Sequence, residues 1–139
     1  MKTFMDTGAW LAVVVQTDQY QDVGVLHYEA LISRRERLFT SDYVLDETVT
    51  RIRYDASHAT AVAFLDLIGE AERLGSLRIL HVDNAVWRAA EALFRQYHDQ
   101  DFSFTDCTSF VLVQQAEVDE VFGFDQHFLM FGFNVKPLW

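Results

Sequence analysis

The sequence predicts an α/β fold in which a parallel sheet is covered by helices on both faces. Short apolar runs alternate along the chain with longer segments of helical periodicity, the pattern of strands joined by crossover helices. Half of the 139 residues are hydrophobic and 23% are charged, which is the composition of a folded chain. The six glycines are scattered and no linker or repeat divides the chain. We therefore expect one domain over residues 1–139.

The first half of the chain is expected to contribute two strands and three helices. The strands are the short apolar runs Lys2–Met5 and Leu38–Ser41. Apolar residues at helical spacing predict the helices Gly8–Val15, Val23–Arg37 and Asp42–Tyr54. The third helix has a hydroxyl or carboxylate side chain at its first residues, where an N-cap belongs.

The second half continues the same alternation. An alanine-rich helix is expected to end before Gly75, because glycine is the usual residue just beyond a helix C-terminus. The helices predicted here are Ala59–Leu74, Asn84–Tyr97 and Phe104–Glu117. The strands predicted here are Leu77–Val82, Glu120–Phe124 and Phe133–Lys136.

Charge and cysteine content exclude several classes of protein. The chain has 11 basic and 21 acidic residues, for a formal charge of −10, which excludes a nucleic-acid binder that works by general charge attraction. Cys107 is the single cysteine, so there is neither an internal disulfide nor a thiolate metal cluster. The apolar run Gly8–Val15 follows Asp6, lacks a cleavage site and is too short to span a bilayer. We therefore expect a cytoplasmic protein without a membrane segment.

Four acidic residues lie at or beside the carboxyl ends of predicted strands. Asp6 and Asp125 each directly follow a strand, whereas Glu47 and Asp106 lie near the start of helices. In a parallel sheet these positions meet at one edge, where ligands bind. A cluster of carboxylates suits hard cations such as Mg2+ or Mn2+, which assist phosphodiester hydrolysis by activating water and neutralising charge.

Each of these residues also has a purely structural interpretation. These interpretations are an N-cap for Asp6, a capping box with Ser103 for Asp106, a turn for Asp125 and an ion pair with Arg51 for Glu47. The functional interpretation therefore depends on all four residues converging on one place. The five histidines show no metal-ligand spacing, which argues against zinc. His127, two residues after Asp125, could approach a substrate or cap the following turn.

Four motifs carry a resemblance to a known family. Their order, their spacing and the chain length resemble those of PIN-domain nucleases, and among them VapC-like toxins of type II toxin–antitoxin systems. The motifs are Met5-Asp6-Thr7, Ser41-Asp42-Tyr43-Val44-Leu45-Asp46-Glu47-Thr48, Phe102-Ser103-Phe104-Thr105-Asp106-Cys107 and Phe124-Asp125-Gln126-His127-Phe128.

The resemblance implies a fold, an activity and a site. The fold is an α/β/α sandwich with a central, mainly parallel five-stranded sheet. The activity is RNA cleavage that depends on Mg2+ or Mn2+, and the partners are RNA, a cognate antitoxin and a second copy of the chain in a homodimer. The family's acidic quartet corresponds to Asp6, Glu47, Asp106 and Asp125, and Thr7 and Thr105 are candidates for a supporting hydroxyl. Phe122, Gly123 and Phe124 offer no polar side chain where some relatives carry Ser or Thr.

Other functions remain open at this point. A receiver-like signalling module also carries acidic residues at strand ends, but it needs adjacent carboxylates after the first strand, where Asp6 stands alone. The complete quartet argues against a non-catalytic antitoxin-binding protein of the same fold, although the sequence alone does not exclude one. A DNA-directed nuclease of this fold also stays open, because no residue identifies a reader of the RNA 2′-hydroxyl. The sequence does not identify the RNA or its cleavage sequence.

Aromatic and apolar surfaces have two interpretations. Eight phenylalanines crowd the C-terminal third, where they could stack on unpaired bases or, as we expect, fill the core. The apolar stripes of the helices Val23–Arg37 and Ala59–Leu74 are candidates for a dimer or antitoxin surface.

Overall fold

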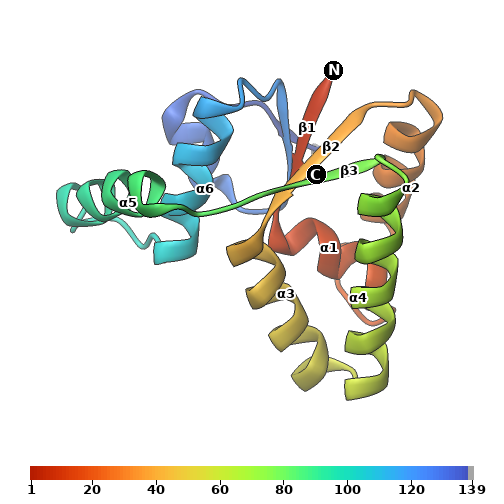
Figure 1. Cartoon of the computed structure of the whole chain (residues 1–139). Coiled ribbons are helices and arrows are strands. Elements are labelled where there is room, and N and C mark those ends of the chain that lie inside the picture. The colour runs from red at the N-terminus through yellow and green to blue at the C-terminus, as the bar shows by residue number, and fades with distance from the viewer. Residues whose placement is uncertain (138–139) are drawn as a thin grey trace.

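A five-stranded parallel sheet forms the centre of the computed structural model, which describes residues 1–137 (Figure 1). The strand order is β3-β2-β1-β4-β5, so the first strand lies in the middle. The strands are β1 (Lys2–Met5), β2 (Arg37–Ser41), β3 (Leu77–Leu80), β4 (Glu120–Phe122) and β5 (Val135–Lys136). The predicted fold class is confirmed, and every strand pair among the described residues is parallel.

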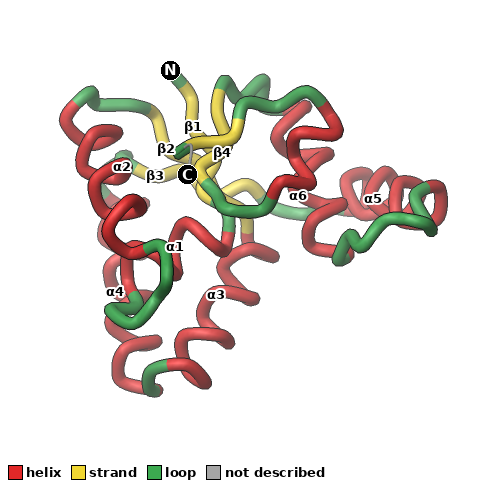
Figure 2. The backbone as a smooth tube through the Cα atoms, turned by 180° about the vertical axis from the view of Figure 1, so that it is seen from behind, coloured by secondary structure: helices red, strands yellow, loops and turns green. Residues whose placement is uncertain are grey.

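Helices cover the sheet on both faces. Figures 1 and 2 show α5 and α6 on one side and α1, α2 and α4 on the other, while α3 extends away beside α4. The helices are α1 (Thr7–Val14), α2 (Gln21–Ser33), α3 (Asp42–Asp55), α4 (His58–Arg73), α5 (Asn84–Gln96), α6 (Phe104–Gln115) and the short 3-10 helix η1 (Gln126–Phe131). No helix within residues 1–137 has the length and apolar character needed to cross a membrane.

The core lies between the sheet and these helices. Phe4 of β1 is in register with Phe39 of β2 and Val121 of β4, and all three side chains are buried. Thr3, Phe4 and Met5 of β1 are all fully buried, because the central strand of a parallel sheet is covered on both faces. The eight C-terminal phenylalanines are buried in this core or pack against it, so the prediction that they fill the core is confirmed.

A hydrogen-bonded chain fixes α1 on the sheet. The indole Nε1 of buried Trp10 donates to Oγ1 of Thr40 at 3.2 Å, and that hydroxyl donates to the carbonyl of Met5 at 3.0 Å. Three elements are thereby joined where β1 ends and α1 begins. Because buried polar groups are costly to leave unpaired, this chain fixes the position of Asp6, which lies between Met5 and α1.

Gly24 allows α2 to approach α1 closely. A Cβ atom at Gly24 would lie 2.7 Å from Cβ of Ala12, and both residues are buried. Replacing Gly24 with alanine should therefore force the helices apart and lower the free energy of unfolding by about 1–3 kcal/mol. Urea denaturation followed by tryptophan fluorescence measures the change.

Gly69→Ala is the matched control for this substitution. Gly69 is exposed within α4, and nothing lies within 4 Å of the Cβ that alanine would add. Alanine stabilises a helix by about 0.5–1 kcal/mol relative to glycine, so this variant should gain stability. Equal effects of the two substitutions would contradict the close packing of α1 against α2.

Several predicted boundaries are wrong for local reasons. The second helix ends at Ser33 instead of Arg37, because Arg35 adopts a positive φ of 54° and turns the chain into β2. The fourth strand ends at Phe122, so Asp125 lies three residues beyond the strand instead of directly after it. The 3-10 helix η1 is not predicted by the sequence, because six residues are too few to show a helical period.

Candidate active site

The four predicted carboxylates line one pocket of about 390 Å³ at the carboxyl edge of the sheet. They come from the segments after β1 and β4, from the second turn of α3 and from the first turn of α6, elements separated by many residues in sequence. The parallel topology brings these positions together, because every strand ends at the same edge. The pocket is lined by Asp6, Thr7, Gly8, Glu47, Arg51, Asp106, Phe124, Asp125 and Gln126.

Asp6 is the most deeply buried of the four. Its backbone N–H donates to the carbonyl of Phe122 at 3.0 Å, and its carbonyl accepts the N–H groups of Ala9 and Trp10 at the start of α1. It occupies the N-cap position, but its side chain makes no capping hydrogen bond. The residue is 6% exposed and lines the pocket, so the interpretation as a capping carboxylate does not apply to it.

Gly123 lets the backbone after β4 pass directly behind this aspartate. A Cβ atom at Gly123 would lie 3.2 Å from Cβ of Asp6 and 3.4 Å from its Oδ2. Such contacts are tighter than ordinary van der Waals separation, so a larger residue would press on the carboxylate. Glycine at this position therefore allows the backbone to approach Asp6 closely, and it leaves the position without a polar side chain.

Asp106 both caps a helix and lines the pocket. Its carboxylate Oδ2 accepts the backbone N–H of Ser103 at 3.0 Å, while its own N–H donates to Oγ of Ser103 at 2.9 Å. This is the capping box of α6, and it holds the carboxylate in a fixed orientation. The same side chain lines the pocket, because a carboxylate has more acceptor positions than the cap requires.

Asp125 is fixed by a similar local device. Its Oδ1 accepts the backbone N–H of His127 at 2.9 Å, forming a turn that starts η1. For Asp125, as for Asp106, the structural and functional interpretations are therefore compatible. The local hydrogen bonds and the pocket position coexist, and the hydrogen bonds orient the two carboxylates in the pocket.

Glu47 and Thr7 complete one wall of the pocket. Glu47 lies one turn into α3 and makes no ion pair with Arg51, whose guanidinium instead lies 3.9 Å from Asp55. Thr7 is buried, and its hydroxyl lies close enough to the carboxylate of Glu47 to lower the pKa of that group. Thr105 is not part of the pocket wall, and its carbonyl accepts the hydroxyl of Thr108 at 2.7 Å.

Burial and mutual repulsion raise the pKa values of three of these carboxylates. Burial, and then the negative charge of Asp106, raise the pKa of Asp6 to about 8. Burial, and next the negative charge of Asp106, raise the pKa of Glu47, although the positive charge of Arg51 opposes this increase. Burial also raises the pKa of Asp106, against the effect of the Ser103 N–H. The site therefore holds excess negative charge that a bound cation would neutralise.

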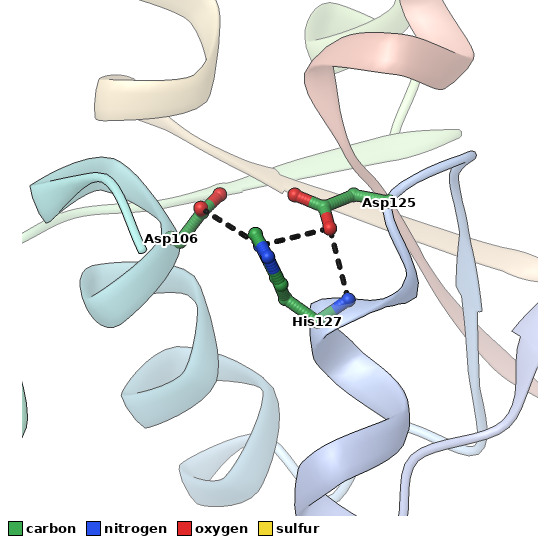
Figure 3. Close-up of side chains that lie close together, drawn as sticks. All are labelled: Asp106, Asp125 and His127. Carbon is green, nitrogen blue, oxygen red and sulfur yellow. Dashed lines mark hydrogen bonds and ion pairs between the residues drawn. The ribbon is translucent and has the colours of Figure 1, made fainter. Parts of the chain in front are cut away.

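His127 is a site residue whose role the sequence does not decide. Its Nδ1 lies 2.9 Å from Oδ1 of Asp125 and 3.6 Å from Oδ2 of Asp106 (Figure 3). Its position two residues after Asp125 is the available signal, but nothing in the sequence distinguishes a ring turned into the site from one turned outward.

The donor set fits a divalent cation. Carboxylate oxygens are preferred ligands of Mg2+ and Mn2+, and the side chain of Thr7 adds a buried hydroxyl to the pocket wall. One ligand atom each from Asp106, Asp125 and His127 lie within 4.8 Å of one another, a spacing that one ion can bridge. Asp6 and Glu47 line the same pocket and would complete the site.

Comparison with known proteins places the chain in a family. The sequence model of the PIN domain matches residues 3–134, so the chain belongs to the PIN-domain family. This agrees with the parallel five-stranded sheet and with the acidic pocket at its carboxyl edge.

Two relatives are a ribonuclease and an rRNA-specific endonuclease by name. The chain is 28% identical over 136 residues to the 23S rRNA-specific endonuclease VapC20 of Mycobacterium tuberculosis, covering 96% of this chain and 98% of the relative. It is 28% identical over 130 residues to a VapC ribonuclease of Archaeoglobus fulgidus, covering 92% of this chain and 80% of the relative.

Solved structures show the same fold. The crystal structure of Mycobacterium tuberculosis VapC20, described as a Sarcin-Ricin loop cleaving toxin, matches with a TM-score of 0.79 at 26% identity, covering 94% and 95% of the two chains. VapBC2 from Rickettsia felis, bound to a DNA fragment from its promoter, matches with a TM-score of 0.69 at 12% identity, covering 98% of each chain. At that identity the second likeness concerns the fold alone.

Proposed function

We propose that this protein is a metal-dependent endoribonuclease that acts as the toxin of a toxin–antitoxin pair. The observation that carries the proposal is the convergence of Asp6, Glu47, Asp106 and Asp125 on one pocket in a chain of the PIN-domain family. The relatives named as VapC ribonucleases support RNA as the substrate. A receiver-like module finds no support, since no second carboxylate adjoins Asp6 and the family is a different one.

The surroundings of the four carboxylates suit them to different roles in the proposed reaction. Asp6, Asp106 and Asp125 would hold Mg2+ or Mn2+, with Glu47 closing the site from α3. When bound, the cation supplies Lewis-acid stabilisation of the charge that builds on the phosphate oxygens. The capping box of Asp106 and the turn at Asp125 keep these two side chains in place before a substrate arrives.

Glu47 is suited to accept a proton from the attacking water. Its carboxylate is half-buried and its pKa is raised, which makes it a better base near neutral pH than an exposed glutamate. Arg51 lies one turn further along α3 in the same pocket wall. Its half-exposed guanidinium is placed to bind a phosphate oxygen of the RNA.

The surfaces of this protein that would bind an antitoxin are apolar and acidic. Exposed apolar side chains gather on α2 and α4, namely Val23, Leu26, Ile32, Val62, Leu65 and Leu67. A helical antitoxin with an apolar face would cover them, and its basic residues would suit a chain with a formal charge of −10. The homodimer, the cytoplasmic location and the single domain over residues 1–139 stay predictions.

The decisive test is a cleavage assay with defined cations. Purified protein is incubated with ribosomal RNA, transfer RNA and single-stranded DNA, each in Mg2+, Mn2+ or EDTA. We expect endonucleolytic products from RNA only, and only with an added cation, with ribosomal RNA the first substrate to map. Cleavage in EDTA would contradict the metal dependence, and cleavage of DNA alone would contradict the ribonuclease assignment.

A growth assay tests the toxin role separately. Expression of the wild-type chain should arrest growth, and co-expression of the short reading frame beside its gene should restore it. Arrest without relief by any neighbouring gene would leave a ribonuclease but contradict the toxin–antitoxin role.

A further inference from the structure

His127 lies between the two carboxylates that line one side of the pocket. Figure 3 shows its ring in the space between Asp106, on α6, and Asp125, at the start of η1. The Nδ1 atom is 2.9 Å from one carboxylate and 3.6 Å from the other. Within residues 1–137, these three side chains form the only group of three or more His, Cys, Asp or Glu residues whose ligand atoms all lie within 4.8 Å.

The Nδ1 atom is not occupied by a hydrogen bond. It is buried from solvent, yet its approach to Asp125 lacks hydrogen-bond geometry, and no other described group serves it. The Oδ1 atom of Asp125 already accepts the backbone N–H of the same histidine. A buried nitrogen without a hydrogen-bond partner, beside two carboxylates, is the arrangement expected of a ligand atom when its ion is taken away.

Aromatic packing holds the ring in this orientation. The His127 ring lies edge-on to Phe102, with centroids 4.9 Å apart and an interplanar angle of 78°. Phe102 is itself buried, against Phe110 and Tyr97. The imidazole is thus oriented by apolar contacts, with Nδ1 facing the carboxylates of Asp106 and Asp125.

We propose that His127 is a nitrogen ligand of the catalytic cation, together with Asp106 and Asp125, and that it makes the site prefer Mn2+ over Mg2+. This inference rests on the proposed function of the acidic pocket. Mg2+ strongly prefers oxygen donors, whereas Mn2+, a transition-metal ion that shares this preference less strictly, accepts an imidazole nitrogen more readily. A site built from carboxylates alone would lack this discrimination, so His127 tunes which ion the enzyme uses.

Spectroscopy of the Mn2+-bound protein tests the ligand directly. Electron spin-echo envelope modulation of the wild-type protein with Mn2+ alone should show coupling to a directly bound nitrogen. Labelling the histidines with heavy nitrogen should change that coupling. In His127→Gln the coupling should disappear, and the Kd for Mn2+ should rise about 10- to 100-fold. The Kd for Mg2+ should change by only about threefold, because Mg2+ depends on the oxygen ligands.

Two control variants separate ligation from packing. His127→Phe keeps an aromatic ring against Phe102 but has no nitrogen, so it should also lose the coupling. His81→Gln removes a histidine whose Nδ1 lies 3.3 Å from Asp42 and which does not belong to the Asp106–Asp125–His127 group, so this variant should keep both the coupling and the Mn2+ affinity. Thermal unfolding of each variant reports whether the fold survives.

The possible outcomes distinguish this inference from the proposed function. Mn2+ that binds without nitrogen coupling in the wild-type protein would overturn the role of His127 and leave a carboxylate site intact. Coupling that persists in both His127 variants would assign the nitrogen to another group and overturn it as well. Failure of Mn2+ and Mg2+ to bind at all would overturn the metal-dependent function itself, and the inference with it.

Discussion

Replacing Asp6 with asparagine will abolish RNA cleavage, with a loss of about 1000-fold or more. Asp6 contributes a buried carboxylate to the pocket, and asparagine removes its charge while keeping its shape. Stabilisation of a phosphodiester transition state by a held cation is worth several kcal/mol, and each ~1.4 kcal/mol is a factor of ten in rate. The measurement is the initial rate of RNA cleavage in saturating Mn2+.

Asp106→Asn should have a comparable effect without unfolding α6. The asparagine side-chain oxygen can still accept the N–H of Ser103, so the capping box is retained. Asp46→Asn is the matched control, because Asp46 neighbours Glu47 in sequence but is exposed and not part of the pocket wall. Wild-type rates in both Asp6→Asn and Asp106→Asn would exclude this pocket as the site of cleavage.

The same Asp6→Asn substitution will stabilise the cation-free protein at high pH. Burial and the charge of Asp106 raise the pKa of Asp6 from 3.8 to about 8 in the folded state. Between these two values the unfolded chain is ionised while the folded chain keeps its proton, so the folded state binds more protons and loses stability as the pH rises. Well below the lower pKa the folded and unfolded states bind the same number of protons at Asp6. Well above the higher pKa the loss of stability is complete.

Denaturation in EDTA measures this effect. From pH 5 to pH 8 the contribution of Asp6 should lower the free energy of unfolding of the wild-type protein by about 3 kcal/mol, at ~1.4 kcal/mol for each pKa unit, with some relief as the neighbouring carboxylates adjust. Asp6→Asn should remove most of that loss. The difference between variant and wild type reports Asp6 together with its coupling to Asp106 and Glu47, because Glu120 (raised pKa) and His27 (lowered pKa) titrate in both proteins.

The effect of Mn2+ on the free energy of unfolding provides an independent test of Asp6. A cation that binds the folded state stabilises it by mass action, so Mn2+ at pH 8 should restore the stability of the wild-type protein. It should raise that of Asp6→Asn much less, whereas Asp46→Asn should behave like the wild type. A difference in unfolding free energy between the wild type and Asp6→Asn that is flat from pH 5 to pH 8 in EDTA would contradict a buried, raised-pKa carboxylate at Asp6.

Much of the fold is visible in the sequence because its signals are local. β1 ends in the buried apolar pair Phe4 and Met5, while α4 and α6 begin behind serine N-caps and α5 behind an aspartate. The boundaries that were wrong depend on features without a period, such as the positive φ of Arg35 and the six-residue helix η1. Short elements like these are set by tertiary contacts more than by propensity.

The sequence by itself determined the alternation of strands and helices and the positions of Asp6, Glu47, Asp106 and Asp125 near strand ends. Only the tertiary structure decided that Asp6 is nearly inaccessible, that the cap of Asp106 also serves the pocket, and that His127 turns into the space between two carboxylates. The reason is physical: strand and helix signals lie in a few neighbouring residues. Burial, charge coupling and ring orientation instead arise from side chains that are far apart in sequence and meet only when the sheet assembles.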